Sequence, residues 1–313
     1  MTALSTEKTD GSPGNGANPA RGRGPWLERE QVFGWLMSLP GVLVLFVTTT
    51  VPLGYLLWTS LRRYNLSDPA GNGFVGLGNY LQLITDDRFW ASLARSGVYT
   101  VSTVVGQLVI GLGLALLVGR INRGRALVRV AAIMPIMLAP VVVGLVWSTL
   151  LLTPDYGVVD FVTQSVGLGK HAWLGDPTLA FVAVIVMHTW QWTPFAFLVF
   201  LAALAAFPTE IEEASKLDGA NAWQHFIHIL LPFLRPTIVV VTIIRTVIAL
   251  SAFDAIYAAT GGGPGTATEI LNLYAYRVTF AELDIGYGSA LAVVLLILTA
   301  VIAALFSRIR RSA

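Results

Sequence analysis

Long apolar stretches alternate with short polar ones along most of the chain. Uncharged runs extend over residues 31–61, 96–119, 130–154, 177–209 and 285–307. A sixth apolar run, 236–268, is interrupted by Arg245 and Asp254. Each run is long enough for the roughly 20 helical residues that cross a hydrocarbon core. The pattern predicts six membrane-spanning helices, over about 32–60, 94–119, 127–152, 179–205, 237–259 and 286–307.

Composition supports an all-α integral membrane protein. Only 12% of the residues are charged, against about a quarter in a soluble domain. A transmembrane barrel would show alternating segments of about ten residues, whereas these runs are continuous. Residues 1–30 are polar and rich in Gly and Pro, so we expect a disordered tail there and a transmembrane domain over 31–313. No short apolar core of a cleavable signal peptide stands at the start, and the absence of cysteine excludes disulfides and thiolate chemistry.

The distribution of basic residues predicts the orientation. Lys and Arg are concentrated in the tail, in the linker "GRINRGRALVR" and after the last span, whereas the loop before the fourth span carries Asp155, Asp160 and Asp176. Positive segments stay inside, so both termini are expected in the cytoplasm. The polar interval 208–232, between the fourth and fifth spans, then also faces the cytoplasm. This topology explains most of the basic excess without a nucleic-acid partner.

The interval "PTEIEEASKLDGANAWQHFIHILLP" (208–232) has a regular pattern of its own. Thr209 and Glu212 have the spacing of a capping box, which predicts a helix from about Glu210. Asp218-Gly219 supplies a break. One apolar stripe of a second, amphipathic helix along the membrane surface follows, formed by Trp223, Phe226, Ile227, Leu230 and Leu231. On this pattern the interval is either a solvated linker or a rigid knob that docks into a cytoplasmic partner.

The spacing within the interval resembles the cytoplasmic loop motif of binding-protein-dependent ABC importers: Glu-Ala-Ala, three residues, Gly, nine residues, Ile-x-Leu-Pro. Here the motif is Glu213-Ala214-Ser215, Gly219 and Ile229-Leu230-Leu231-Pro232, with Ser215 in place of the second Ala. "GLGNYLQLITDDRFWASL", "MPIMLAPVVVGLVWSTLLLTPDYGVVD", "FDAIYAATGGGPGTATEILNLYAYRVTF" and "YGSALAVVLLIL" are similar to the same family. The resemblance covers nearly all of the chain after Trp35 and is strongest to the sugar permeases of the maltose and glycerol-phosphate class.

The resemblance implies a six-span type I permease fold and a non-catalytic subunit of a larger complex. Its partners would be two ATP-binding subunits that hold ATP and Mg²⁺, a second and different permease, and an extracytoplasmic sugar-binding lipoprotein. The complex would lie in the lipid of a bacterial cytoplasmic membrane. Its solute would be a di- or oligosaccharide such as trehalose or maltose, or a glycerol-phosphate type solute. The residues expected to couple this chain to the ATPases are Glu213, Ala214, Ser215, Asp218, Gly219, Ile229, Leu231 and Pro232.

The chain itself has no motif for ATP hydrolysis. A phosphate-binding loop needs G-x-x-x-x-G-K-[ST], and Lys170, the lysine that follows a glycine, has Gln164 where the first glycine should be and His171 where Ser or Thr should be. The Gly-rich segment "TGGGPGTAT" lacks a lysine and is expected on the outer side. It is either a flexible connector or a turn or re-entrant loop at the mouth of the pathway, with Gly261, Gly262 and Gly263 setting its backbone shape. Gly262, Gly263 and Pro264 are the expected outer gate.

Polar residues inside the apolar runs are candidates for the solute path. Arg245 and Asp254 each cost about 2.5–3.5 kcal/mol near the centre of a spanning helix, and helical spacing places them on opposite sides of the fifth span. Asp254, with Ser251 and Tyr257, is expected to line the path, whereas Arg245 is expected to contact another helix. In the fourth span, Gln191, Trp190 and Trp192 are either sugar contacts or interfacial anchors.

Other functions fit the sequence less well. The four histidines do not form a metal-ligand set, and the acids of the third loop are scattered rather than clustered as an enzyme needs. The competing hypothesis is a self-sufficient secondary sugar transporter. Such a protein usually carries a coupling-ion site and an internal repeat, and no convincing repeat is present.

Overall fold

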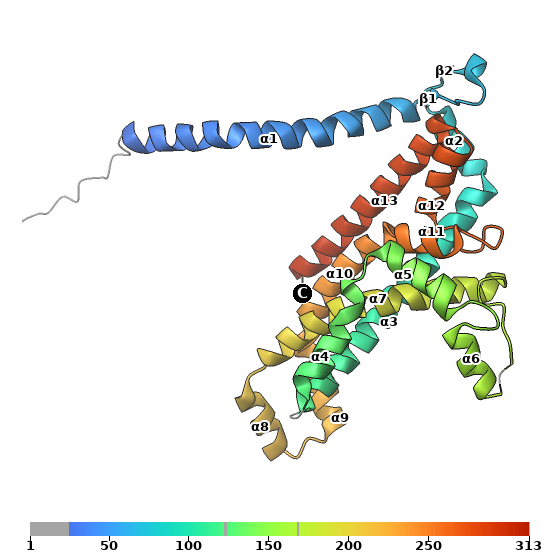
Figure 1. The fold of residues 1–313 in the computed structure, drawn as a ribbon. Coiled ribbons are helices and arrows are strands. Elements are labelled where there is room, and N and C mark those ends of the chain that lie inside the picture. The colour runs from blue at the N-terminus through green and yellow to red at the C-terminus, as the bar shows by residue number, and fades with distance from the viewer. Residues whose placement is uncertain (1–24, 122–123, 168, 313) are drawn as a thin grey trace, which may run out of the picture. The chain divides into compact units, whose positions relative to one another are not determined.

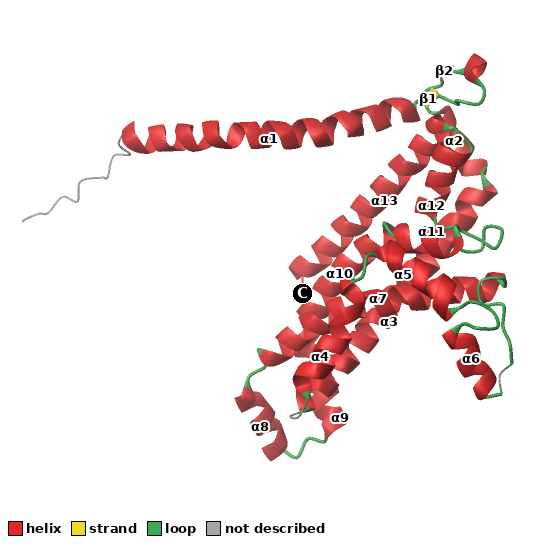
Figure 2. Ribbon diagram, viewed as in Figure 1, coloured by secondary structure: helices red, strands yellow, loops and turns green. Residues whose placement is uncertain are grey.

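The protein is almost entirely helical (Figures 1 and 2). The computed structural model describes residues 25–121, 124–167 and 169–312. The chain divides into two compact units, Met1–Tyr55 and Leu56–Ala313. Most of the expected tail 1–30 lies outside the described residues, but residues 25–30 already belong to a helix.

The first unit consists mainly of helix α1 (Pro25–Ser60), whose last residues belong to the second unit. The helix continues through Pro40 and Pro52, although proline in a helix interior removes a hydrogen bond. Spanning helices tolerate such prolines. Its stretch Met37–Ser60 is long and apolar enough to cross a membrane, in agreement with the span expected over 32–60.

The second unit holds the other elements. They are β1 (Arg62–Arg63), η1 (Pro69–Gly71), β2 (Gly73–Phe74), α2 (Gly78–Thr85), α3 (Asp87–Arg120), α4 (Arg125–Ile133), η2 (Met134–Met137), α5 (Pro140–Val146), η3 (Trp147–Leu151), α6 (Val158–Ser165), α7 (Pro177–Ala205), α8 (Thr209–Leu217), α9 (Ala222–His225), η4 (Phe226–Leu230), α10 (Leu231–Leu250), α11 (Asp254–Thr260), α12 (Leu271–Tyr276), η5 (Arg277–Ala281) and α13 (Ile285–Ser312). The two short strands pair antiparallel, with Arg62 opposite Phe74.

Five described helical segments can cross a membrane by length and composition. They are Met37–Ser60, Asp87–Gly119, Pro177–Ala205, Ala222–Leu250 and Ile285–Phe306. A sixth candidate is the pair Ala126–Met137 and Pro140–Leu151, which is bent by 98°. The bend lies before Pro140, where Ala139 is extended (ψ 138°), because a residue that precedes proline avoids the helical region. Counted as one span, this pair gives the predicted number of six.

The prediction for the fifth span, 237–259, was wrong at both ends. The amphipathic segment expected to lie along the membrane surface is the beginning of the span itself, since helix runs without a break from Ala222 to Leu250. A π-helical turn, η4, joins α9 to α10, and such a turn changes the hydrogen-bond register inside a helix. At the other end, Phe253 is non-helical (φ −151°, ψ −59°) and α11 starts at Asp254. Arg245 and Asp254 therefore lie on different helices.

Helix α3 runs through the core of the second unit. Its start packs on α2, α12 and α13 around Leu271 and Leu291. Its middle packs on α5, α7 and α11 around Tyr99 and Ile256. Its end packs on α7 and α10 around Phe197. The elements that carry the candidate site, α7, α10 and α11, are thus fixed against one central helix.

Candidate functional site

Helix α8 ends in a Schellman motif at Gly219. The amide of Ala220 donates to the carbonyl of Ser215 at 3.0 Å, and the amide of Gly219 donates to the carbonyl of Lys216 at 3.2 Å. Gly219 has a φ of 75°, in the left-handed region where a Cβ atom costs energy. Within the described structure nothing lies within 4 Å of the place a Cβ would take. The backbone conformation, rather than lack of space, therefore requires glycine.

The turn after Gly219 is fixed by a capping box at the start of α9. The side chain of Asn221 accepts from the amide of Gln224 at 2.9 Å, and the amide of Asn221 donates to Gln224 Oε1 at 2.9 Å. The capping box predicted at Thr209 and Glu212 does not form, because Pro208 precedes α8 as a cap without a side-chain bond. Glu212 is instead paired with Lys216 at 2.7 Å. The spacing Asn221-x-x-Gln224 in the sequence is that of a capping box as well, and it could have predicted this helix start.

Ser215 joins the two helices of this loop. Its side chain is buried, and its hydroxyl lies 2.8 Å from Nδ1 of His225 and donates to the carbonyl of Glu212 at 2.8 Å. The ring of Phe207 contacts the same imidazole edge-on, at 5.9 Å between ring centroids. The 208–232 loop is thus internally bonded rather than a loose linker.

Most residues predicted to couple to a partner lie on the open surface of this loop. Glu213, Ala214, Asp218 and Gly219 are exposed, whereas Ile229 and Leu231 are half-buried and Pro232 is exposed, all three where the helix continues toward the membrane. Leu217, which the sequence reasoning missed, is 88% exposed. Its position just before Asp218-Gly219 could have indicated a side chain at the tip of the turn.

A cavity of about 240 Å³ opens between α3, α7, α10 and α11. Four of the residues predicted for the solute path line it: Gln191, Trp192, Ser251 and Asp254. Tyr99 and His188, which were not predicted, line it too. Among the described residues, the buried atoms Tyr99 Oη and Gln191 Oε1 have no hydrogen-bond partner. The cavity therefore offers free hydrogen-bonding groups, a carboxylate and an indole ring.

Two predicted residues, Trp190 and Tyr257, do not line this cavity. Trp190 lies against Trp147, at 5.8 Å between ring centroids, and faces a different, apolar cavity of about 440 Å³ between α3, α4 and α7. Tyr257 stacks on Phe253 at 5.3 Å and meets Tyr276 at 5.1 Å. Asp254 and Tyr257 are thus neighbours on α11, but of the two only Asp254 lines the cavity.

Arg245 supports the cavity wall from behind. Its side chain is fully buried, and it donates from Nε to Gln107 Oε1 at 2.7 Å. Its Nη2 lies 3.3 Å from His188 Nε2, and the guanidinium lies 4.5 Å from the centre of the Trp192 ring. The predicted contact with other helices is confirmed. Gln107 was missed, although an amide inside the uncharged run 96–119 was the available signal.

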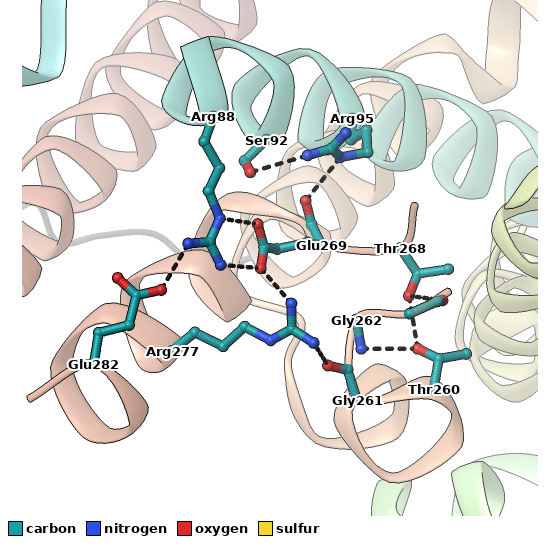
Figure 3. Close-up of polar contacts among 11 residues, drawn as sticks. Arg88, Ser92, Arg95, Thr260, Gly261, Gly262, Thr268, Glu269, Arg277 and Glu282 are labelled. Carbon is teal, nitrogen blue, oxygen red and sulfur yellow. Dashed lines mark hydrogen bonds and ion pairs between the residues drawn. The ribbon is translucent and has the colours of Figure 1, made fainter. Parts of the chain in front are cut away.

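A buried carboxylate anchors the segment after the Gly-rich loop (Figure 3). The Glu269 side chain is 0% exposed and accepts two bonds from Arg88, both at 2.8 Å, and one from Arg277 at 2.7 Å. Arg88 also pairs with Glu282 at 2.6 Å. Burial by itself would raise the pKa of Glu269, but the hydrogen bonds and charges of the two arginines outweigh it and lower the pKa. The ionised carboxylate thus holds α3, the loop and η5 together.

The Gly-rich loop has a defined conformation, unlike the flexible connector considered from sequence. Thr260 and Thr268 share a hydrogen bond of 2.7 Å, and the Thr268 hydroxyl also donates to the carbonyl of Gly263 at 2.9 Å (Figure 3). Gly262 has a φ of 93°, and the peptide bond between Gly263 and Pro264 is cis. The prediction that the glycines set the backbone shape agrees with the positive φ of Gly261 and Gly262, whereas the role of Gly262, Gly263 and Pro264 as a gate remains a prediction.

Comparison with known proteins identifies the family. The family model described as "Binding-protein-dependent transport system inner membrane component" matches residues 107–312, which include the 208–232 loop and most of the cavity. The chain belongs to this family. It is therefore a membrane component of a transport system, and the recognition made from the loop motif is confirmed.

Relatives that are about one-third identical in sequence align with nearly all of this chain. The sulfoquinovosyl glycerol transport system permease protein SmoG of Agrobacterium fabrum is 35% identical over 92% of this chain and 93% of its own length. The trehalose/maltose transport system permease protein MalF of Thermococcus litoralis is 34% identical, over 86% and 90%. The trehalose transport system permease protein SugA of Mycobacterium tuberculosis is 34% identical, over 90% and 89%.

Solved structures support the fold of this family member. A chain of a bacterial ABC transporter for the acidic polysaccharide alginate has a TM-score of 0.78 at 22% identity, covering 91% of this chain and 97% of that one. A chain of the MetNI methionine ABC transporter, in an inward-facing conformation, has a TM-score of 0.53 at 19% identity, covering 75% and 98%. The type I permease fold expected from the sequence is confirmed.

Proposed function

We propose that this permease forms half of the solute pathway of an ATP-driven, binding-protein-dependent sugar importer. One observation carries the proposal: a single helix, Ala222–Leu250, joins the exposed 208–232 loop to the cavity. Its first turn is bonded to α8 through His225, and its last turns bring Val247 and Ile248 to the cavity wall. A displacement of the loop by a partner would therefore reach the cavity through a continuous element.

The chemistry of the cavity supports a sugar as solute. Gln191, Ser251 and Asp254 can bond hydroxyl groups, and the ring of Trp192 offers an apolar face to a sugar ring. The three relatives are named for the transport of sulfoquinovosyl glycerol, of trehalose and maltose, and of trehalose. We therefore assign the solute to the di- and oligosaccharides such as trehalose or maltose, with a glycerol-phosphate type solute as the second choice.

The proposal includes the partners and the orientation. The 208–232 loop would dock on one of two ATP-binding subunits in the cytoplasm, which hold ATP and Mg²⁺. Both termini would be cytoplasmic, in line with the distribution of Lys and Arg. A second, different permease would complete the pathway. An extracytoplasmic sugar-binding lipoprotein would deliver the solute to the side that carries Gly262, Gly263 and Pro264.

A pair of substitutions at Gly219 tests the coupling role. Valine is strained at a φ of 75°, by about 1–2 kcal/mol, whereas asparagine tolerates this region. We expect Gly219→Val to insert and assemble normally but to lower ATP-driven trehalose or maltose uptake by roughly 5- to 30-fold. Gly219→Asn is expected to remain near the wild type. The measurement is uptake and sugar-stimulated ATPase activity of the complex in proteoliposomes. Normal uptake by a well-expressed Gly219→Val protein would contradict the proposal.

Purification of the chain from its native membrane in mild detergent distinguishes the proposed importer from the alternative, a secondary transporter. The proposal expects an ATPase and a second permease to co-purify in stoichiometric amounts. A chain that is recovered alone, and that carries out sugar uptake alone in vesicles, would instead establish the secondary transporter.

A further inference from the structure

Helix α6 (Val158–Ser165) has an exposed apolar face. Val158, Phe161 and Val162 share one side of the helix, at spacings of three and four residues. Phe161 is 70% exposed and Val162 is 52% exposed, and Val166, directly after the helix, continues the same side. Tyr156, just before the helix, is exposed as well.

The innermost residue of α6 is polar. Asp160 is fully buried, and its carboxylate accepts from Gln164 Nε2 at 2.8 Å. The same carboxylate accepts from the backbone amides of Asp155 at 3.2 Å and His171 at 3.1 Å. On a surface helix in water the polar side faces outward and the apolar side faces the core. On α6 the fully buried residue is an aspartate, and three of the exposed residues are apolar, although Gln164 and Ser165 are exposed as well; this pattern favours apolar surroundings beside Val158, Phe161 and Val162.

The position of α6 in the chain places it beside the membrane. The segment 152–157 separates it from η3, the end of the bent pair, and the spanning helix α7 follows at Pro177. It packs against η3, where Leu150 is also exposed. The exposed apolar face of α6 thus belongs to a helix in contact with part of a candidate membrane span. In Figure 1, α6 stands apart from the bundle of α3, α7 and α10.

We propose that α6 is an interfacial helix that lies in the headgroup and acyl boundary of the lipid bilayer. Its valines and Phe161 then contact acyl chains, and Tyr156 takes the interfacial position that aromatic residues prefer. The carboxylate of Asp160 stays inside the loop and meets no lipid. A protein partner fits less well, because one face of an eight-residue helix is far smaller than the roughly 800 Å² that each side of a stable protein interface buries.

Site-directed spin labelling tests this proposal directly, since the chain has no cysteine. Single-cysteine variants Phe161→Cys and Val162→Cys report on the apolar face. Thr163→Cys, half-buried on the inner side, and Ser67→Cys, exposed in a loop, are the controls. Each labelled chain is assembled with its co-purifying subunits in vesicles of phosphatidylcholine and phosphatidylglycerol. The accessibility of the nitroxide to oxygen, which enters lipid, is compared with that to a water-soluble nickel chelate.

We expect the ratio of oxygen to nickel accessibility to be several-fold higher at residues 161 and 162 than at residue 67, with residue 163 protected from both. Protection of residues 161 and 162 from both reagents would mean that a protein covers this face, and it would overturn the proposal. Nickel accessibility like that of residue 67 would place the helix in water and would overturn it equally. Neither readout depends on transport, so the result is independent of the proposed function.

Discussion

Arg245 shows how a charged residue is accommodated inside an apolar bundle. A buried charge is costly unless its hydrogen-bonding capacity is used. Here an amide, an imidazole and an indole ring surround the guanidinium, from Gln107, His188 and Trp192, whereas its Nη1 has no hydrogen-bond partner among the described residues. Because His188 and Trp192 also line the cavity, the shape of the cavity depends on a residue that does not line it.

The bond between Gln107 and Arg245 gives a prediction at the same scale. Gln107→Leu removes the acceptor at 2.7 Å, and we expect it to lower stability by about 1.5–3 kcal/mol, the worth of a hydrogen bond to a charged group. The double variant Gln107→Leu with Arg245→Met should recover much of this loss, since an apolar replacement of a buried polar pair is often neutral. Thermal unfolding of the purified complex measures both, and a double variant weaker than Gln107→Leu alone would contradict the argument.

Residue spacing also explains which of the predicted path residues line the cavity. Trp190, Gln191 and Trp192 are consecutive in α7, and each step turns the side chain by about 100°. Such a triplet cannot face one cavity, and the structure selects Gln191 and Trp192. Asp254 lines the cavity from α11 rather than from the expected fifth span, because α10 ends at Leu250, and its place on the solute path remains a prediction.

At the scale of elements, the crossing of α3 and α7 depends on small residues, as helix contacts in membranes commonly do. A Cβ on Gly111 would lie 2.8 Å from the Ala196 Cβ and 3.0 Å from the Phe197 amide nitrogen, whereas Gly113 has open space. Gly111→Ala is therefore expected to destabilise the complex by about 1–3 kcal/mol. Gly113→Ala, the matched control, should be neutral or stabilise by about 0.5–1 kcal/mol through helix propensity. Equal melting temperatures for the two variants would refute this view of the crossing.

The Glu269 cluster predicts an acid-sensitive contact between elements. Its lowered pKa means that the ionised form adds stability above the ordinary value of 4.5, and that this contribution is lost as the pH falls through the lowered value. At neutral pH, Glu269→Gln should cost about 2 kcal/mol. The difference in melting temperature between wild type and variant should shrink below pH 4.5. Glu282→Gln, at a carboxylate that is 49% exposed, is the control and should cost less. A difference that stays constant in acid would count against the assignment.

For the whole molecule, the sequence predicted the class, the number of spans and the approximate position of most of them. The fourth span, expected over 179–205, is Pro177–Ala205. Hydropathy is a local property, so single segments are readable in this way. The bend before Pro140, the π-helical turn and the separate helix α11 were not predicted. They depend on how backbone hydrogen bonds are redistributed between neighbouring helices, which no single segment records.

The unbroken helix from Ala222 to Leu250 has a thermodynamic consequence. If a solute in the cavity prefers one arrangement of this helix, and a protein bound to the 208–232 loop prefers the same one, each must tighten the binding of the other by an equal factor. The change in the partner's binding constant for the loop then measures how strongly the solute in the cavity favours that arrangement of the helix. A sugar that fills the cavity without changing that binding constant would not be coupled to the protein bound at the loop.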